Sequence, residues 1–209
     1  MKQFILPLLL LLCAGLFVNS PALAAPSEAV LTAAVKNYFT PLFAGLETAA
    51  RQQPTVDTFR ETIKPLVADL DGFFGSTLID SDFVIRQTYL RRNFLAVGYD
   101  LKKVDELDYF WDLMRKAPGP QLSEPGHGSL LQPRLIAMRH PILRDGQLTG
   151  VVSLMIRTKA FLKATGLDRV AAYRIVCRGQ EAESAGELGD DYRQITVQLP
   201  ANEWLIQYR

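Results

Sequence analysis

The chain has 209 residues, of which 48% are hydrophobic, and 23 Lys and Arg residues stand against 22 Asp and Glu residues. A chain of this size can bury one substantial core, so we expect a single domain. Because the charges nearly balance, we expect no nucleic acid partner and no electrostatic binding to anionic lipid.

Residues 1–24 have the order of a signal peptide. A single positive charge at Lys2 is followed by an almost entirely apolar stretch from Phe4 to Val18, and Ala22-Leu23-Ala24 forms an A-x-A cleavage site. The apolar stretch is shorter than the roughly 20 residues that a membrane-spanning helix needs. We therefore expect residues 25–209 to be one periplasmic or secreted domain that does not insert into the membrane. A retained membrane anchor is the alternative.

Two helices are predicted next. In residues 27–52 apolar side chains recur at spacings of three and four, with Pro41 expected to kink or split the helix. A second helix is predicted over 56–70, with Thr55 or Asp57 as its cap.

The pattern then changes to strands. Residues 72–80 and 83–89 predict a hairpin that turns at Ser81-Asp82. Residues 91–101 are irregular, and 103–116 predict a helix with Phe110 and Trp111 among its apolar residues. A loop rich in Pro, Gly and Ser follows over 117–133, and a loop of this length often covers a site.

The last third of the chain predicts more strands. Residues 134–143 and 147–157 form a hairpin around Asp145-Gly146. A short helix over 158–165 ends at Gly166. Further strands are expected over 171–178, 192–199 and 204–208. The order predicts an α+β fold with a mainly antiparallel sheet and helices packed beside it.

The region from Thr77 to Thr158 resembles the Cache family of extracytoplasmic sensor domains. Four segments carry the resemblance through their order and spacing: Leu78–Ile85, Val97–Leu101, Asp108–Trp111 with the loop that follows it, and Arg139–Val152 with its Pro, Asp-Gly and Gly-Val-Val positions. The resemblance implies a PAS-like antiparallel sheet with a long N-terminal helix and flanking helices. It also implies a stand-alone single-Cache-like module that binds a small molecule.

One departure concerns the ligand. Members of the family that bind amino acids commonly carry an Asp where this chain has Met155. The resemblance therefore implies a ligand other than a free amino acid, and we expect an organic acid.

Arg139 is the preferred anchor for such a ligand, because its planar guanidinium can bind a carboxylate through two hydrogen bonds. By strand alternation it shares a face with Ala137 and Pro141, whereas His140 points to the other face. Aromatic side chains and the 117–133 loop are expected to complete the site. The candidate ligand-binding residues are Tyr89, Tyr99, Tyr109, Trp111, Ser123, His127, Arg139 and Met155.

No enzyme site is predicted. The two histidines, His127 and His140, lack Cys or Glu at metal-ligand spacing, so we expect no metal and no cofactor. Gly126-His127-Gly128-Ser129 lacks the strand-turn-helix setting of a nucleophile elbow. Cys177 lies in an apolar alternation and is predicted to be a buried strand cysteine. A reactive thiol or an intermolecular bridge is the alternative.

The sequence thus predicts a sensing module that signals through a separate membrane receptor or kinase. The competing hypothesis is a structural or adaptor protein that docks on a membrane receptor without a ligand. A third is an enzyme of unfamiliar type, which would need polar residues clustered around His127 or His140.

Overall fold

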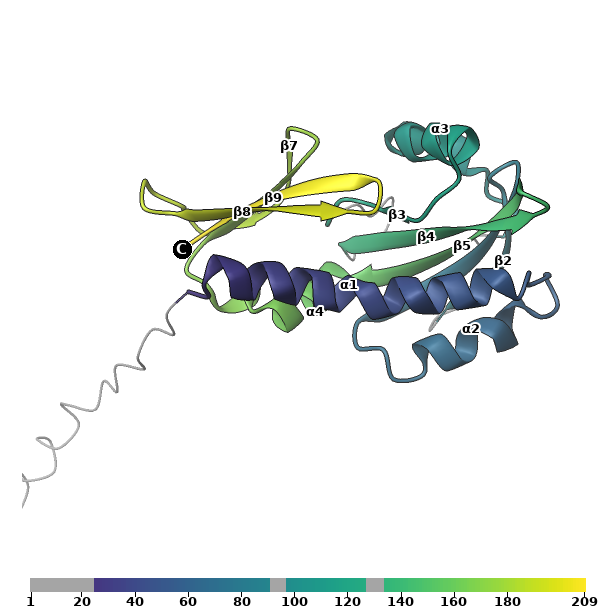
Figure 1. The fold of residues 1–209 in the computed structure, drawn as a ribbon, viewed down its shortest axis with the longest axis horizontal. Helices are drawn as coiled ribbons and strands as arrows, with labels where there is room; N and C mark the ends of the chain where they lie inside the picture. The colour runs from purple at the N-terminus through teal and green to yellow at the C-terminus, as the bar shows by residue number, and fades with distance from the viewer. Residues whose placement is uncertain (1–24, 91–96, 127–133) are drawn as a thin grey trace, which may run out of the picture.

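The computed structural model describes residues 25–90, 97–126 and 134–209. The predicted signal peptide, residues 1–24, and the candidate ligand residue His127 lie outside these ranges. Two antiparallel sheets lie along one long helix, α1 (Figure 1). Within the described ranges, no helix has the length and hydropathy needed to cross a membrane.

Helix α1 (Glu28–Arg51) forms as its apolar spacing predicted, and the hydroxyl of Ser27 caps it by accepting a backbone N–H at 3.4 Å. Pro41 does not split the helix. Because Pro41 and Asn37 are both exposed, water can reach the Asn37 carbonyl that the proline leaves without a partner. One stripe of the helix is buried and faces the sheets: Leu31, Val35, Phe39, Leu42 and Leu46.

Helix α2 (Phe59–Val67) is shorter than the predicted 56–70, and its N-cap is Thr58. The prediction of Asp57 as the cap was wrong. Thr55 caps the turn that leads into the helix, because its hydroxyl accepts the Thr58 N–H at 3.4 Å and its carbonyl accepts the Phe59 N–H at 2.9 Å. The backbone N–H of Thr55 donates to the Thr58 hydroxyl at 2.9 Å, so these residues form a turn ahead of the helix.

The first sheet has five antiparallel strands in the order β2-β1-β5-β4-β3. Helices α1 and α4 pack on one of its faces, and α3 lies on the opposite side of the sheet from α1 (Figure 1). Both sheet and helices match the α+β class that the sequence predicted. The strands are β1 (Phe73–Asp80), β2 (Ile85–Leu90), β3 (Gln121–Leu122), β4 (Leu135–Arg144) and β5 (Gln147–Arg157).

The first hairpin differs from its prediction at the turn, which runs over residues 81–84 instead of Ser81-Asp82 alone. The carboxylate of Asp80 organises this turn by accepting two backbone N–H bonds within it at 3.0 and 2.9 Å. Phe83 leaves the strand with φ 61° and is buried against Trp111, with 4.6 Å between ring centroids. The turn therefore supplies an aromatic residue to the core beneath α3.

Helix α3 (Asp108–Lys116) is shorter than the predicted 103–116. Two 3₁₀ turns, Leu101–Lys103 and Asp105–Leu107, lead into it. The buried face of α3 carries Phe110, Trp111 and Met114.

The β4–β5 hairpin turns at Asp145-Gly146 as predicted, with φ 51° and 77° at the two residues. Helix α4 (Thr158–Thr165) follows directly and ends at Gly166, which has φ 79°.

The C-terminal strands form a second, four-stranded sheet in the order β7-β6-β9-β8. Its inner face packs on α1 and α4, where the rings of Phe39 and Phe161 each lie 5.5 Å from that of Trp204. The sequence did not predict β7, because its residues are mostly polar and it lies at an edge of the sheet. The strands are β6 (Tyr173–Cys177), β7 (Gln180–Ala185), β8 (Arg193–Leu199) and β9 (Asn202–Tyr208).

The end of β9 lies beside the start of α1 (Figure 1). The Tyr208 hydroxyl donates to the carbonyl of Pro26 at 3.0 Å, and Arg193 donates to the carbonyls of Ala25 and Pro26. The first and last described residues are therefore held at the same end of the molecule.

Candidate functional site

A buried polar row crosses the face of the first sheet that looks toward α3. Its members are direct neighbours in the strand register, so their side chains share one face. A polar row across a sheet centre is unusual, because burial of polar groups costs free energy unless they find partners. The row consists of Thr88, Thr77, Ser153, Arg139 and Gln121, one from each strand.

Arg139 is the charged member of this row, and only 4% of it is exposed. Its guanidinium carbon lies 5.1 Å from the ring centroid of Phe110 and 4.9 Å from that of Trp111, within cation–π range. Nη1 has no hydrogen-bond partner in the described part of the chain. Burial lowers the pKa of Arg139 to about 10, a change that the nearby carboxylate of Glu124 opposes. The group therefore stays positively charged at neutral pH.

Gln121 lies opposite Arg139 on the neighbouring strand and is 1% exposed. Its side-chain Nε2 donates to the carbonyl of Phe110 at 2.8 Å, which fixes the orientation of the amide. Its Oε1 accepts no hydrogen bond from any described residue. This oxygen is a buried acceptor without a donor.

Glu124, 8% exposed, lies just beyond β3 and connects the two sheets. Its Oε1 pairs with Nε of Arg178 at 2.7 Å and accepts from the side-chain amide of Asn202 at 3.4 Å. Its Oε2 has no partner among the described residues. Oε1 therefore binds residues of the second sheet, and Oε2 is available to accept a hydrogen bond.

Apolar side chains from α3 fill the part of this face nearest the β4–β5 hairpin. Trp111 stacks on Phe83 there and donates from Nε1 to the carbonyl of Leu101 at 3.3 Å. Ile79 and Val151 of the sheet belong to the same buried cluster. The polar row thus begins where this apolar cluster ends.

Four of the residues predicted for the site share this face or line it. Arg139 and Trp111 are in contact, as described above, and Met155 is half-buried beside the polar row, opposite Gly75 and Ala137. Ser123 is buried nearby, but its hydroxyl already accepts the Ala137 N–H at 2.7 Å and donates to a backbone carbonyl at 3.2 Å.

None of the three predicted tyrosines lies on the polar row, although the Tyr109 ring lies 4.5 Å from the guanidinium carbon of Arg178, which pairs with Glu124. Tyr89 lies on the opposite face of the sheet, where its ring centroid is 6.0 Å from that of Phe73. Tyr99 is exposed, next to β2. Tyr109 is also exposed, and its hydroxyl reaches the carbonyl of Ala201 in the second sheet at 3.4 Å. Tyr109 therefore belongs to the contact between α3 and the second sheet.

The sequence did not single out Gln121 or Glu124. Both lie in the Pro-rich segment that was predicted to be a loop, and a strand of two residues leaves no periodic signal. Only the folded chain shows that Gln121 lies opposite Arg139 on β4 and that Glu124 pairs with Arg178 of the second sheet.

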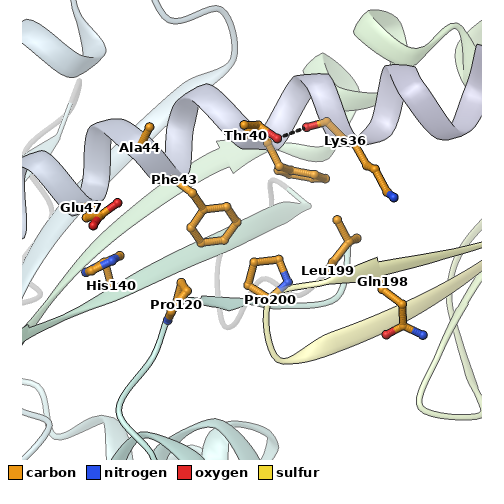
Figure 2. A pocket seen from close by; sticks show the side chains of 11 residues that line it. Lys36, Thr40, Phe43, Ala44, Glu47, Pro120, His140, Gln198, Leu199 and Pro200 are labelled. Atoms are coloured by element: carbon orange, nitrogen blue, oxygen red, sulfur yellow. Dashed lines mark hydrogen bonds between the residues drawn. The ribbon is translucent and has the colours of Figure 1, made fainter.

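A separate open groove lies on the other side of the sheet, between α1 and the edges of both sheets (Figure 2). Its volume is about 450 Å³. His140 reaches this groove, as alternation with Arg139 predicted. The lining residues are Lys36, Phe39, Thr40, Phe43, Ala44, Glu47, Pro120, His140, Gln198, Leu199 and Pro200.

Within residues 25–90, 97–126 and 134–209, no three His, Cys, Asp or Glu side chains come together as a metal site. Cys177 is buried in β6, as the alternation predicted, and burial raises the pKa of its thiol. A thiol with a raised pKa is a poor nucleophile.

No protein-family model matches the chain, and no curated protein sequence matches it. Solved structures do match. An extracellular ligand-binding receptor from Desulfohalobium retbaense superposes with a TM-score of 0.66 at 13% identity over 86% of this chain, and the match spans 39% of that receptor chain.

Chemoreceptor domains match over nearly their whole length. The ligand-binding domain of the Pseudomonas aeruginosa amino acid chemoreceptor PctC, in complex with GABA, has a TM-score of 0.64 at 14% identity, covering 86% of this chain and 94% of that one. The corresponding domain of PctB, in complex with L-Arg, has a TM-score of 0.63 at 15% identity and covers 87% and 90%.

The chain therefore has the fold of extracellular ligand-binding domains of bacterial chemoreceptors. This is the Cache-like fold that the sequence resemblance implied. At these identities the likeness concerns the fold alone.

Proposed function

We propose that this protein is an extracytoplasmic binding module for a small organic acid, and that Arg139 binds the acid's carboxylate. One observation carries the proposal: a guanidinium buried on a polar row has Nη1 without a partner among the described residues. An isolated buried charge costs free energy. An anion at Arg139 would supply the missing acceptor through a charge-assisted hydrogen bond.

The structural neighbours support a carboxylate. GABA and L-Arg, bound by the PctC and PctB domains, each carry a carboxylate. In this chain Met155, a thioether, stands on the Arg139 face where the family resemblance places the aspartate that binds an amine. This difference favours an acid without a free ammonium group.

We further propose that residues 1–24 direct export, and that the bound form acts on a separate membrane receptor or kinase. The neighbours support this because they are the sensing parts of membrane chemoreceptors or extracellular receptors.

A thermal-shift assay with a panel of small mono- and dicarboxylates tests the proposal. A ligand at 100 times its Kd stabilises a protein by about 2.7 kcal/mol. For a chain of this size, that corresponds to a melting temperature about 5–10 °C higher.

Arg139→Met should abolish the shift, since it keeps the bulk of the side chain and removes the charge. The matched control is Arg144→Met, because Arg144 lies on the same strand but is exposed. The control should keep the full shift. The proposal fails if no acid in the panel shifts the melting temperature, or if Arg139→Met responds as the unsubstituted protein does.

A further inference from the structure

The polar atoms around Arg139 that lack partners among the described residues indicate that the ligand carries another polar group besides its carboxylate. Three buried residues each have one such atom in the described part of the chain: Nη1 of Arg139, Oε1 of Gln121 and Oε2 of Glu124. One is a donor and two are acceptors. A bare carboxylate can satisfy the donor, but it offers nothing to the acceptors.

Neither unpaired oxygen can be replaced at its position by a hydrogen-bond donor of the same side chain. The Gln121 amide is fixed because its Nε2 is already bonded to the Phe110 carbonyl at 2.8 Å. The Glu124 carboxylate is held by Arg178 at 2.7 Å and by Asn202 at 3.4 Å, both through Oε1. The remaining oxygens therefore require a group that donates a hydrogen bond.

These acceptors lie near Arg139. Gln121 is the direct cross-strand neighbour of Arg139, and the side chains of such a pair stand side by side. The charge of Glu124 acts on Arg139, although the two form no ion pair in the structure. Phe110 contacts both Gln121, through its carbonyl, and Arg139, through its ring, and the same ring lies 5.3 Å from the guanidinium carbon of Arg178, which pairs with Glu124.

The charges favour a neutral donor on the ligand. Arg139 and Arg178 contribute two positive charges, and Glu124 contributes one negative charge. The neighbouring Arg134–Glu183 pair, at 2.8 Å, is balanced. A ligand with one net negative charge would neutralise this cluster, whereas a zwitterion would leave its excess positive charge in place.

We propose that the ligand of the Arg139 site is a hydroxycarboxylate, whose carboxylate binds Arg139 and whose hydroxyl donates to Oε1 of Gln121. This inference rests on the proposed binding of a carboxylate at Arg139. The further inference is that the site prefers acids whose own hydrogen-bond donor lies next to the carboxylate. A site that binds a hydroxyl through buried acceptors discriminates strongly against the analogue without it, since those acceptors then stay unpaired.

The test is calorimetric titration of the exported protein with three matched sets of monocarboxylates of three to six carbons. Each acid is used with hydrogen, hydroxyl or ammonium at carbon 2. We expect the hydroxy acid to bind at least about tenfold more tightly than the unsubstituted acid, and more tightly than the amino acid.

The variant Gln121→Met should reduce this preference for the hydroxy acid several-fold, because it removes one acceptor and keeps the side-chain length. A ratio of affinities cancels any general loss of binding that the substitution causes. The control is Gln198→Met on β8, where the glutamine is exposed and belongs to the second sheet. It should leave the ratio unchanged.

Two results overturn the inference and leave carboxylate binding intact: equal binding of the hydroxy and unsubstituted acids, or tightest binding of the amino acids. Unchanged discrimination in Gln121→Met also counts against it. If none of these acids binds but another acid of the thermal-shift panel does, this inference fails alone. If no acid of either set binds, the proposed function fails as well.

Discussion

The two faces of the five-stranded sheet differ in kind, although the same strands supply both. The face toward α1 is apolar and carries Leu78, Leu122, Met138, Val152 and Leu154. The face toward α3 carries the polar row with Arg139 at its centre. Strand alternation lets one sheet bury a hydrophobic core on one side and hold buried polar groups on the other.

The comparison indicates where stability and binding originate. The apolar face interlocks with α1, α4 and the second sheet, so its side chains should dominate the free energy of unfolding. The polar face holds a charge and acceptors that have no partner in residues 25–90, 97–126 and 134–209, which costs stability in the absence of a ligand. Substitutions on the two faces should therefore act with opposite signs.

The largest effect is expected on the apolar side. Phe161 of α4 is fully buried, and its ring stacks on Phe39 with 5.3 Å between centroids. Phe161→Ala should lower the free energy of unfolding by about 3–5 kcal/mol, measured by urea denaturation. At temperatures where the variant is folded, its affinity for the acid that binds the unsubstituted protein should be unchanged. A loss below about 1 kcal/mol would contradict the assignment of this face to stability.

Arg139→Met should have the opposite effect without ligand. Replacing a buried charge that lacks an ion-pair partner by an apolar side chain of similar length should raise the free energy of unfolding by about 1–2 kcal/mol. Urea denaturation of the ligand-free protein measures this. If the variant is instead less stable by more than about 1 kcal/mol, the guanidinium is a structural group and the distinction between the faces is wrong.

A smaller loss is expected at Ser76, which lies on β1 next to the polar-row residue Thr77. The Ser76 hydroxyl donates to the backbone carbonyl of Ser153 at 2.5 Å. Ser76→Ala should cost about 1 kcal/mol, because the buried carbonyl loses this donor. Ligand affinity should stay the same. A change in affinity without a change in stability would show that Ser76 serves binding.

The smallest effect is expected at the hairpin turn, where Asp80 pairs with Arg86 at 2.6 Å. Burial acts to raise the pKa of Asp80, but hydrogen bonds from the Val84 N–H and from Arg86 outweigh it and hold the pKa below 3.8. The ionised form is thus favoured in the folded state, and its contribution is lost as the pH falls through the lowered pKa.

Asp80→Asn should therefore lower stability by less than about 1 kcal/mol at pH 7. The difference from the unsubstituted protein should shrink as the pH falls below 3.8. Thermal unfolding between pH 7 and pH 2 measures both. A difference that grows toward acid pH would contradict the direction of the pKa shift.

Local signals in the sequence were enough to predict many of the helices and turns of this fold. Asp145-Gly146 predicted the second hairpin and Gly166 predicted the end of α4, because both turns require positive φ values. The apolar period predicted α1 within a residue at each end. The resemblance of residues 77–158 supplied the PAS-like sheet, but it left the second sheet unplaced.

The candidate site was predictable only in part. Arg139 and Trp111 could be chosen because strand alternation and helix periodicity indicate which way they face. Gln121 and Glu124 could not, since Gln121 pairs with a strand more than a dozen residues away and Glu124 contacts Arg178 and Asn202, which are farther still along the chain. Tyr89, a candidate ligand residue, lies on the face opposite Arg139, which the sequence could not show because a register between strands cannot be read from one strand alone.

The contact between Tyr208 and Pro26 has a practical consequence for labelling. A fluorophore or purification tag joined to either end of the described chain emerges beside the four-stranded sheet (Figure 1). Neither attachment would crowd the Arg139 face beneath α3. Two dyes, one at each end, would start close together and would report any separation of β9 from the first turn of α1.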